Sequence, residues 1–560
     1  MCPPNTTSTS TTTTTTNHMN CFKEKRIAIV GGGGISGLQT IRSLKARGFE
    51  NVVAYEGSHD LGGIWKQNYS NVSVQVPRAL FEFPDFPMSD VDWNGYATGP
   101  QVQRYMEDYA DRFQLRDWIV FGAFVTKIAR MNSNSNSSSS NSSFWQLQVQ
   151  TRDKTTTELF DYVIVAAGLY SASNQFIPQI KGMHDHFQGQ VIHSCQFYNA
   201  AMAQNKRVVV IGGGKSAIDI AVEAAKHNNN NNDATQQPVT LLPREMHWPS
   251  PRKLLGIIPT HWILMSRLGT ALVCTQTATF PRTKQEAIHN HSISHKLWTV
   301  VTRPIYKIYE MLVAWQFKLH RKLLLYPQNN VIQDFYNIHY NINDDLTNMR
   351  KKGKINLQVG EIVQFQPDGD TLLLKDGSTL KADLVVSATG FQENYDIFDH
   401  QLYQQLDIQD DGVYMYRFMI PPKVPHMAFV GHVNAVSNIG TYGLQAEWLA
   451  RYLTGELTEM PPRDQNSMMQ EIEQHHQQWA RSFMPKTKVR GMTILLHQTQ
   501  YWDRLLMDMG INPHRKTNIF AEYFMVYGPS DYNGIIGGSN ASSTTSSMQK
   551  KIATRPWTWY

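Results

Sequence analysis

The sequence predicts an α/β protein built from two doubly wound, Rossmann-like domains, the second inserted into the first. The prediction rests on a pattern that occurs twice. The β-branched run Arg26–Val30 leads into a glycine turn, a helical stretch and a second apolar run. The same order of features starts again at Arg207–Ile211. Strand, glycine turn, helix and strand form a βαβ unit, so two of them indicate two separate parallel-sheet domains.

Two further apolar runs are expected to join the parallel sheets as returning strands. They are Tyr162–Gly168 and Leu384–Gly390, and both end in small residues. The second lies far beyond the second βαβ unit, so we expect the chain to leave the inserted domain near residue 330. The expected ranges are a polar tail at 1–24, the first part of the first domain at 25–175, the inserted domain with a helical insertion at 176–330, the second part of the first domain at 331–530, and a second tail at 531–560.

The composition is that of an ordinary globular protein. Of 560 residues, 41% are hydrophobic and 18% are charged, and the formal net charge is only +6. So small a basic excess does not indicate a nucleic-acid partner, although it suits a cofactor with several phosphates. The cysteines form no CxxC pair, which argues against a disulfide framework, a zinc cluster or a dithiol redox centre. Their scarcity favours a reducing, cytoplasmic location.

Three low-complexity tracts are expected to be expanded loops or a tail. They are 131–143, 228–237 and 537–549, and none has enough apolar residues to fold. No apolar run is long enough to predict a helix that spans a membrane. The nearest, Leu254–Cys274, is interrupted by His261 and Arg267.

The first glycine turn satisfies the pattern GxGxxG with Gly32, Gly34 and Gly37. The first glycine permits the turn, the second lets a pyrophosphate approach the backbone, and the third allows the helix to pack closely on the strand. Glu56 ends the following strand, where a carboxylate can accept hydrogen bonds from both ribose hydroxyls. These residues predict a dinucleotide site.

The helix after this turn is expected to offer N–H groups to the phosphates, at Ile35 and Ser36. The tract Gly31–Gly34 contains one more glycine than the motif needs, so two registers compete. The alternative register would put Ser36 at the packing position. We therefore predict that Gly31 is an inserted residue between strand and turn.

The second glycine turn repeats the pattern with Gly212, Gly214 and Ala217, alanine being tolerated at the packing position. Gly214, Lys215 and Ser216 also resemble the end of a P-loop motif. That motif requires a glycine at position 209, which is Val209, and it is therefore excluded.

Arg244 indicates which dinucleotide the second turn takes. It follows the second strand of this unit, where an acidic residue would bind an unmodified ribose and an arginine can pair with a 2′-phosphate. Lys215 and Ser216 begin the helix and are expected beside the phosphates, with Lys215 adding positive charge. These residues favour NADPH over NADH; the alternative is that Arg244 is a solvated surface charge.

Four further segments match the motifs of one known family. Phe187–Phe197 fills every fixed position of the pattern FxGxxxHxxx(Y/F). Leu61–Trp65 fits GG(L/I)W, Phe83–Pro87 fits DFP, and Ala388–Gly390 is an ATG strand end. Together they resemble the flavin-containing monooxygenases, in the branch that oxygenates nitrogen or sulfur and is typical of plants and microbes. The resemblance extends from about residue 25 to about residue 530.

The resemblance implies an enzyme that binds FAD at the first turn and NADPH at the second. In this family NADPH reduces FAD, the reduced flavin captures O2, and a C4a-hydroperoxyflavin transfers one oxygen atom to a soft nucleophile. That nucleophile is an amine nitrogen or a thioether sulfur of a small molecule. The cofactor carries the chemistry, so neither a metal nor a side-chain nucleophile is required.

The resemblance also points to single residues near the flavin. Ile64 and Trp65 belong to the GG(L/I)W element and are expected to contact the cofactor. Gln75 stands where many members carry an asparagine that supports the oxygenated intermediate, and glutamine occurs there in plant-like and microbial branches. His193 is expected to couple the two domains, with direct proton transfer as its less favoured role. Gly431–Trp448 resembles the family's last flavin-contacting turn and helix.

The segment 254–325 has two interpretations. It is rich in Leu, Ile, Trp and Tyr, with basic residues at helical intervals. Its helices either pack over the substrate tunnel or on the partner domain, which is the favoured interpretation, or make peripheral contact with a membrane surface.

Three alternatives to a nitrogen- or sulfur-oxygenating enzyme stay open. A Baeyer–Villiger enzyme uses the same cofactors on ketones, but its motif ends in Trp followed by Pro or Asp, whereas this chain has Phe197–Tyr198. An NADPH oxidase would release hydrogen peroxide. A silent flavoprotein would serve as a binding module, and the paired nucleotide motifs weigh against it. The substrate and a homodimeric assembly are left open as well.

Overall fold

The computed structural model describes residues 24–131, 145–171, 174–228, 238–274, 293–319, 326–337, 345–457, 464–477, 480–481, 484 and 489–536. The expected Thr-rich tail and the low-complexity tracts at 131–143, 228–237 and 537–549 lie almost wholly outside these residues. The expected tail at 531–560 begins too early, because Tyr532, Ile535 and Ile536 are buried in the core. Its Gly- and Ser-rich composition hid these apolar side chains.

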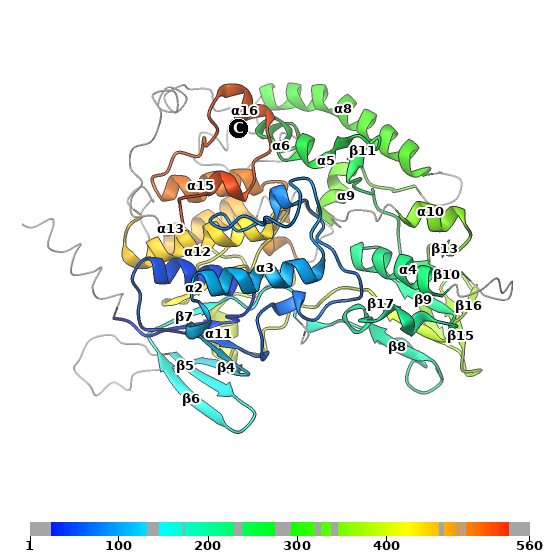
Figure 1. The fold of residues 1–560 in the computed structure, drawn as a ribbon, viewed down its shortest axis with the longest axis horizontal. Coiled ribbons are helices and arrows are strands. Elements are labelled where there is room, and N and C mark those ends of the chain that lie inside the picture. Colours follow the sequence, from blue (N-terminus) through cyan, green and yellow to red (C-terminus); the bar gives the residue numbers. More distant parts are fainter. Residues whose placement is uncertain are drawn as a thin grey trace, which may run out of the picture.

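The first sheet has five parallel strands, in the order β18 (Met427–Phe429), β7 (Tyr162–Val165), β1 (Ile27–Val30), β2 (Val52–Glu56) and β3 (Ile119–Phe121). Every residue of β1 and β7 is buried, which is typical of a parallel sheet covered on both faces. Helices α2 (Ile35–Ala46) and α12 (Asn438–Thr454) pack against each other beside this sheet (Figure 1).

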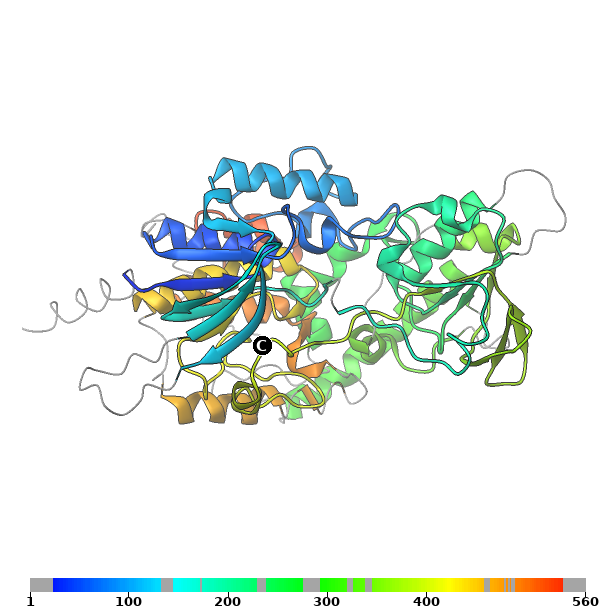
Figure 2. The same ribbon diagram turned by 90° about the horizontal axis from the view of Figure 1, so that it is seen from below.

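The second sheet also has five parallel strands, in the order β13 (Ile355–Leu357), β10 (Val239–Leu242), β9 (Val208–Ile211), β17 (Leu384–Ser387) and β8 (Gln190–His193). Helices α4 (Lys215–His227) and α10 (Asp345–Lys351) lie against it. Seen from below, the two sheets occupy separate lobes (Figure 2). The predicted fold class, with two Rossmann-like domains, is confirmed.

The return of the chain to the first domain lies later than predicted. We expected it near residue 330, but β13 and β17 both pair within the second sheet. The first strand to rejoin the first sheet is β18, beside β7. Strand β17 is buried throughout and apolar except for Ser387, so its composition suits either sheet, and only strand pairing decides which one it joins.

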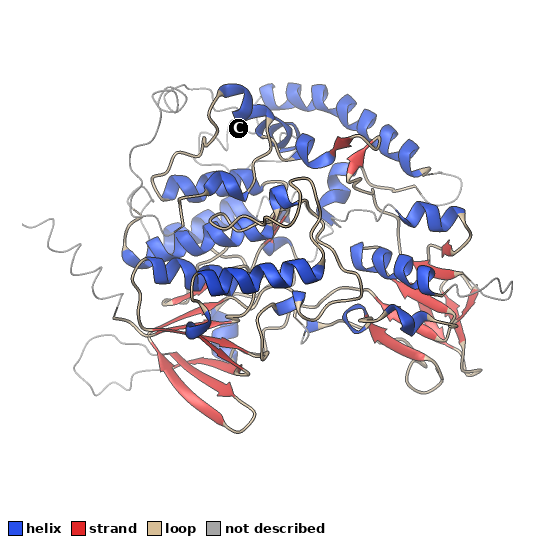
Figure 3. Ribbon diagram, viewed as in Figure 1, coloured by secondary structure: helices blue, strands red, loops and turns tan. Residues whose placement is uncertain are grey.

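Two small antiparallel sheets extend the lobes. They consist of β4 (Phe124–Arg130), β5 (Trp145–Gln150) and β6 (Thr155–Phe160), and of β14 (Ile362–Phe365), β15 (Thr371–Leu374) and β16 (Thr379–Lys381). The strands gather at two places, with most helices above and between them (Figure 3). The pairing of β4 with β5 confirms the hairpin expected around the Asn/Ser tract.

The remaining elements belong to the helical insertion or to other parts of the chain outside the two parallel sheets. Those of the helical insertion are β11 (Lys253–Leu254), β12 (Ile258–Pro259), α5 (Thr260–Leu264), α6 (Arg267–Cys274), α8 (Ile293–Phe317) and α9 (Val331–Asn337). The others are α3 (Gly99–Arg112), α11 (His400–Gln405), β19 (Asn434–Ala435), α13 (Gln465–Glu471), β20 (Thr493–Leu495), α15 (Gln498–Asp508) and α16 (Ile519–Phe524). Within the described residues, no helix is both long and apolar enough to cross a membrane.

Candidate active site

The first glycine turn brings α2 into direct contact with the end of β1. A Cβ atom placed on Gly37 would lie 2.2 Å from the carbonyl oxygen of Gly31 and 2.7 Å from Cα of Gly32. Real carbon and oxygen atoms never approach so closely without a backbone shift. Position 37 is therefore restricted to glycine, as the motif requires.

The two glycine turns differ in length by one residue. Gly31 and Gly212 each follow their strand directly, and their φ angles are +94° and +133°. An added Cβ would lie 2.7 Å from the carbonyl oxygen of Ala166 at Gly31, and 2.4 Å from that of Ala388 at Gly212. The two glycines hold equivalent places, so the extra residue lies after Gly31, inside the turn. Its predicted position between strand and turn is wrong.

Glu56, at the end of β2, lies over the first turn. One of its carboxylate oxygens accepts a hydrogen bond of 2.8 Å from the backbone N–H of Gly33. The other accepts bonds of 3.0 Å from the backbone and the hydroxyl of Ser58. Because a carboxylate has about four acceptor sites, Glu56 can still accept hydrogen bonds from ribose hydroxyls.

The start of α2 fits a pyrophosphate. Its N-cap is Gly34, no side chain caps the helix, and its first turn, which includes Ile35 and Ser36, holds no acidic residue. Nothing lies within 4 Å of a Cβ built on Gly34. Unpaired N–H groups and the helix dipole thus face open space, where an anion is stabilised.

Two distant segments close around this turn. The N–H of Gly62 donates a bond of 2.9 Å to the carbonyl of Gly33, which brings Ile64 and Trp65 beside the turn. Gly431 has a φ of +80°, and an added Cβ would lie 2.5 Å from Cβ of Ser36. Its N–H donates to the amide oxygen of Gln445 in α12, at 3.0 Å. The sequence pointed to Gly31 as an extra residue and to the turn that begins at Gly431, but it did not single out Gly33 as the partner of Glu56.

The second turn offers a similar anion site. Gly214 is the N-cap of α4, again without a side-chain cap, an acidic first turn or neighbours within 4 Å of a built Cβ. Ser216 lies in the first turn of this helix. Arg244 is exposed just beyond β10. It makes no ion pair with any residue in the described part of the chain, so its guanidinium is available to a phosphate.

Lys215 does not lie where we predicted. It is only 6% exposed and forms an ion pair with Asp219, one turn further along α4. Asp219 also accepts a hydrogen bond of 2.9 Å from the hydroxyl of Tyr69, in the first domain. Burial lowers the pKa of Lys215, opposed by the charge of Asp219. Its charge is directed to the contact between the domains, so the structure does not support a role for it beside Arg244.

His193 joins the two strand ends that face the junction of the domains. Its Nδ1 accepts a bond of 3.3 Å from the N–H of Cys195, so the proton is on Nε2, which lies 2.9 Å from the carbonyl oxygen of Gly390. The side chain is fully buried, and burial lowers its pKa. A neutral imidazole with both nitrogens engaged is suited to positioning rather than to proton transfer.

Gln75 lies on a segment that is packed in the first domain and contacted by the inserted domain. Its neighbours Val74 and Val76 are buried, and Gln75 itself is half-buried. Arg252, from the inserted domain, reaches the hydroxyl of Ser73 at 3.4 Å and stacks over the ring of Tyr96, 4.2 Å from its centroid. The structure therefore places Gln75 near the interdomain junction, in a segment fixed on both sides.

Comparisons with known proteins agree with this geometry. A family model described as flavin-binding monooxygenase-like matches residues 24–313 and 299–525. The probable flavin-containing monooxygenase 1 of Arabidopsis thaliana is 27% identical over 535 residues, which cover 90% of this chain and 96% of that protein.

Solved structures share the fold at low sequence identity. The S-allyl-L-cysteine S-oxygenase from Allium sativum has a TM-score of 0.56 at 18% identity, over 87% of this chain and 89% of that one. An oxidized steroid monooxygenase bound to NADP has a TM-score of 0.62 at 18% identity, over 87% of this chain and 98% of that one.

Proposed function

Because the chain belongs to the flavin-binding monooxygenase-like family, we propose that it oxygenates the nitrogen of an amine or the sulfur of a thioether in a small molecule. The protein is an NADPH-dependent flavin monooxygenase, with FAD and NADPH as its cofactors. The two cofactors fit the pair of uncapped, open helix starts at Gly34 and Gly214. A flavin and a nicotinamide held there would meet at the junction of the domains. The observation that carries the substrate class is Phe197–Tyr198 at the end of the family motif.

Each site has one residue that distinguishes its dinucleotide. At the first site, the carboxylate of Glu56 accepts hydrogen bonds from the ribose hydroxyls of FAD. The N–H of Gly33 holds this carboxylate in place. At the second, Arg244 pairs with the 2′-phosphate of NADPH, which the guanidinium fork can bind through two hydrogen bonds. Ile64 and Trp65 line the flavin side.

The finer chemistry is part of the proposal. Bound FAD would supply the C4a-hydroperoxyflavin route, in which one oxygen atom of O2 reaches the nucleophile. The side-chain amide of Gln75 both donates and accepts hydrogen bonds and so can hold the reacting groups. His193 stays neutral and fixes the strand end at Gly390.

The substrate class is favoured by the motif rather than by the fold. Phe197 is fully buried and Tyr198 is 73% exposed, where the Baeyer–Villiger motif has Trp and then Pro or Asp. The S-allyl-L-cysteine S-oxygenase is a thioether enzyme by name. The steroid monooxygenase and cyclohexanone monooxygenase structures share the fold as well, so fold alone does not separate ketones from thioethers.

The test is a single aerobic experiment on the purified, flavin-loaded protein. NADPH is added, and flavin absorbance and hydrogen peroxide are followed together, with amines, thioethers and ketones as substrates. We expect a long-lived flavin adduct, and then an N-oxide or S-oxide with little peroxide. Conversion of ketones to esters instead would establish the Baeyer–Villiger activity. Immediate peroxide without an adduct would establish an oxidase.

We also propose a cytoplasmic location. Cys195 is a free thiol, and burial raises its pKa to about 11. A thiol that stays protonated and unpaired is suited to a reducing compartment.

A further inference from the structure

Arg252 and Arg267 both belong to the inserted domain, and both reach the first domain. Arg252 directly precedes β11, and Arg267 is the first residue of α6. The guanidinium of Arg252 lies 4.2 Å from the ring centroid of Tyr96. That of Arg267 lies 4.4 Å from the ring centroid of Tyr527. Each guanidinium thus rests its flat face on an aromatic ring, which leaves its N–H edge for acceptors.

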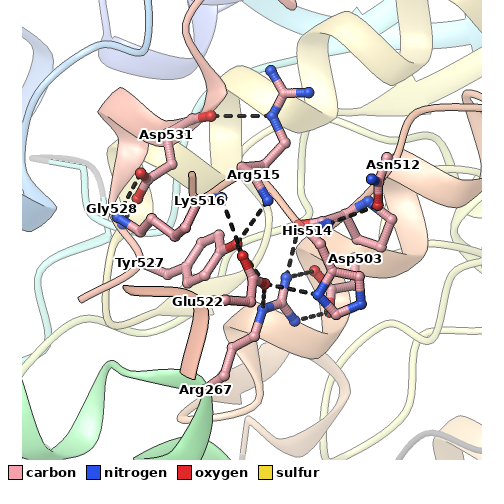
Figure 4. Close-up of polar contacts among 11 residues, drawn as sticks. Arg267, Asp503, Asn512, His514, Arg515, Lys516, Glu522, Tyr527, Gly528 and Asp531 are labelled. Carbon is pink, nitrogen blue, oxygen red and sulfur yellow. Dashed lines mark hydrogen bonds and ion pairs between the residues drawn. The ribbon is translucent and has the colours of Figure 1, made fainter. Parts of the chain in front are cut away.

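The N–H edge of Arg267 is bound by carboxylates (Figure 4). Its two terminal nitrogens bind the two oxygens of Asp503 in α15, at 2.6 and 3.0 Å. Its Nε lies 2.5 Å from a carboxylate oxygen of Glu522 in α16. Arg267 is 1% exposed, and so deeply buried a charge requires such partners because an unpaired buried charge is costly.

The N–H edge of Arg252 meets no carboxylate in the described part of the chain. Its Nη2 lies 3.4 Å from the hydroxyl of Ser73, and its buried Nε has no hydrogen-bond partner among the described residues. All the other arginines that the described ranges place 4.2–4.4 Å from an aromatic centroid pair with a carboxylate: Arg26, Arg42, Arg267 and Arg417. Arg252 has the same arrangement, and its N–H edge is available to a carboxylate from outside the protein.

Arg252 lies near a second cation of the inserted domain. Burial lowers the pKa of Lys215, and the positive charge of Arg252 acts in the same direction. Lys215 pairs with Asp219, one turn further along its own helix. The carboxylate of Asp219 is thus engaged by Lys215, and an anionic ligand would meet a favourable potential at Arg252.

Ser73 connects Arg252 to the segment that carries Gln75. Ser73 and Gln75 are partly exposed, whereas the alternate residues of this segment are buried: Val72, Val74 and Val76. The alternation indicates that the side chains of Ser73 and Gln75 lie on the same side of the segment, away from the core. Two residues of extended chain span about 7 Å. A small molecule held at Arg252 therefore extends to the amide of Gln75.

We propose that Arg252 binds the carboxylate of the substrate, and that the substrate is a small carboxylic acid with a thioether sulfur or an amine nitrogen. The guanidinium offers two parallel N–H groups to the two carboxylate oxygens, as Arg267 does to Asp503. The nucleophilic atom then lies a few bonds from the carboxylate, near Gln75. The inference rests on the proposed function, because that function places the reacting groups at Gln75.

The experiment compares an acid with its neutral amide on the flavin-loaded, full-length protein. Methylthiopropanoate and methylthiopropanamide share one thioether and differ in the charge that Arg252 would bind. The amine pair is dimethylaminopropanoate and its amide. We expect the KM of the acid to be at least about tenfold lower than that of the amide.

The variant R252Q should raise the KM of the acid about ten- to a hundredfold, because hydrogen bonds to a charged group are lost. Its kcat with the acid should change little, as for an interaction made equally in the bound substrate and the transition state. The KM of the amide and that of NADPH should stay as they are. R252K keeps the charge without the planar fork and should recover part of the affinity.

Matched controls distinguish this inference from the proposed function. K253Q removes the exposed neighbouring charge and should leave both KM values unchanged. Oxygenation of the amide by R252Q verifies that the variant is folded and holds its flavin, and R252K takes its place if flavin is lost. Equal changes for acid and amide would overturn the inference alone, and a raised KM for NADPH would assign Arg252 to that cofactor instead. Failure of the unchanged protein to oxygenate any of the four compounds would overturn the proposed function, and the inference with it.

Discussion

The two glycine turns are built on one plan and differ at three points. The first is one residue longer, has Gly37 where the second has Ala217, and is followed by Glu56 where the second is followed by Arg244. At Gly37 the helix touches the backbone of the turn, whereas Cβ of Ala217 lies 3.4 Å from the position that a Cβ on Gly212 would take. The helix after the first turn thus leaves no space for a side chain at position 37, whereas the helix after the second turn accommodates the methyl group of Ala217.

This difference concerns the cofactor that each turn holds. In the first turn the extra residue places the N–H of Gly33 on the carboxylate of Glu56, so that carboxylate is positioned before any ligand arrives. The exposed Arg244 has no such partner among the described residues. A preorganised site loses less freedom on binding and holds its ligand longer.

The largest effect is expected from G37A. The new methyl group would clash with Gly31, so we expect loss of the flavin and a decrease in the free energy of unfolding of at least about 3 kcal/mol. Flavin content and thermal melting measure both. The matched variant A217G should cost only about 1 kcal/mol, the usual penalty of glycine in a helix. Equal losses in the two variants would mean that the turns do not differ in packing.

Next in size is K215M, which removes one partner of a buried ion pair. Asp219 would lose its buried cation, so we expect a decrease in the free energy of unfolding of about 3 kcal/mol. The preference for NADPH over NADH should stay unchanged, because Lys215 faces the first domain. Denaturant unfolding and the ratio of the two KM values provide the measurements. A changed cofactor preference would restore Lys215 to the phosphate site.

R244A should act on one cofactor only. Loss of hydrogen bonds to a charged phosphate is worth about 1.5–3 kcal/mol, so the KM for NADPH should rise about ten- to a hundredfold. The KM for NADH and the flavin content should stay as they are. Steady-state kinetics with both nucleotides checks this. If both KM values rose alike, Arg244 would have no role in recognising the 2′-phosphate.

G34A separates cofactor binding from folding. Its φ of −87° suits any residue and nothing lies near a built Cβ, so the flavin-free protein should keep its stability. FAD should bind about tenfold more weakly, since the methyl group stands where the pyrophosphate approaches the backbone. Fluorescence titration of the flavin-free protein gives the dissociation constant. An unchanged constant would place the pyrophosphate elsewhere.

The smallest effect is expected from H193N, at the junction of the two domains. Burial lowers the pKa of His193 from its ordinary value near 6.5, so the imidazole is neutral at neutral pH. Its contribution to stability is complete above about pH 6.5 and is lost as the pH falls towards the lower pKa of the folded state. H193N should slow flavin reduction several-fold at every pH, through misplacement of the strand end. Loss of one limb of the pH–rate profile would instead identify His193 as an acid or a base.

The sequence predicted most of what depends on local order. Both βαβ units, the fold class, the glycine motifs and the family followed from residues close together in the chain. Position in the chain also placed Glu56 and Arg244 at strand ends, because a strand, its turn and its helix fix the direction of the next strand. The comparisons with known proteins agree on the family and on both cofactors.

The predictions that were wrong depended on contacts between distant residues. The apolar run at β17 pairs with β9 and β8, and nothing in its own composition distinguishes the two sheets. Lys215 pairs with Asp219 on its own helix, and the hydrogen bond that Asp219 accepts from Tyr69 of the first domain cannot be read from the chain. The exposed side of α8 is also a tertiary result, since a helix with apolar residues on several sides does not reveal which side the core takes.

The glycine turns show where the division lies. The sequence by itself determined that two dinucleotides bind, and that one of them is phosphorylated at the ribose, because these properties reside in short motifs. Only the tertiary structure decided that the extra glycine lies inside the first turn. That placement depends on φ of Gly31 and on its contact with Ala166, a residue far along the chain. A turn motif depends on residues that are adjacent in the chain, so the sequence predicts it. A steric contact between two backbone segments depends on residues that only the fold brings together.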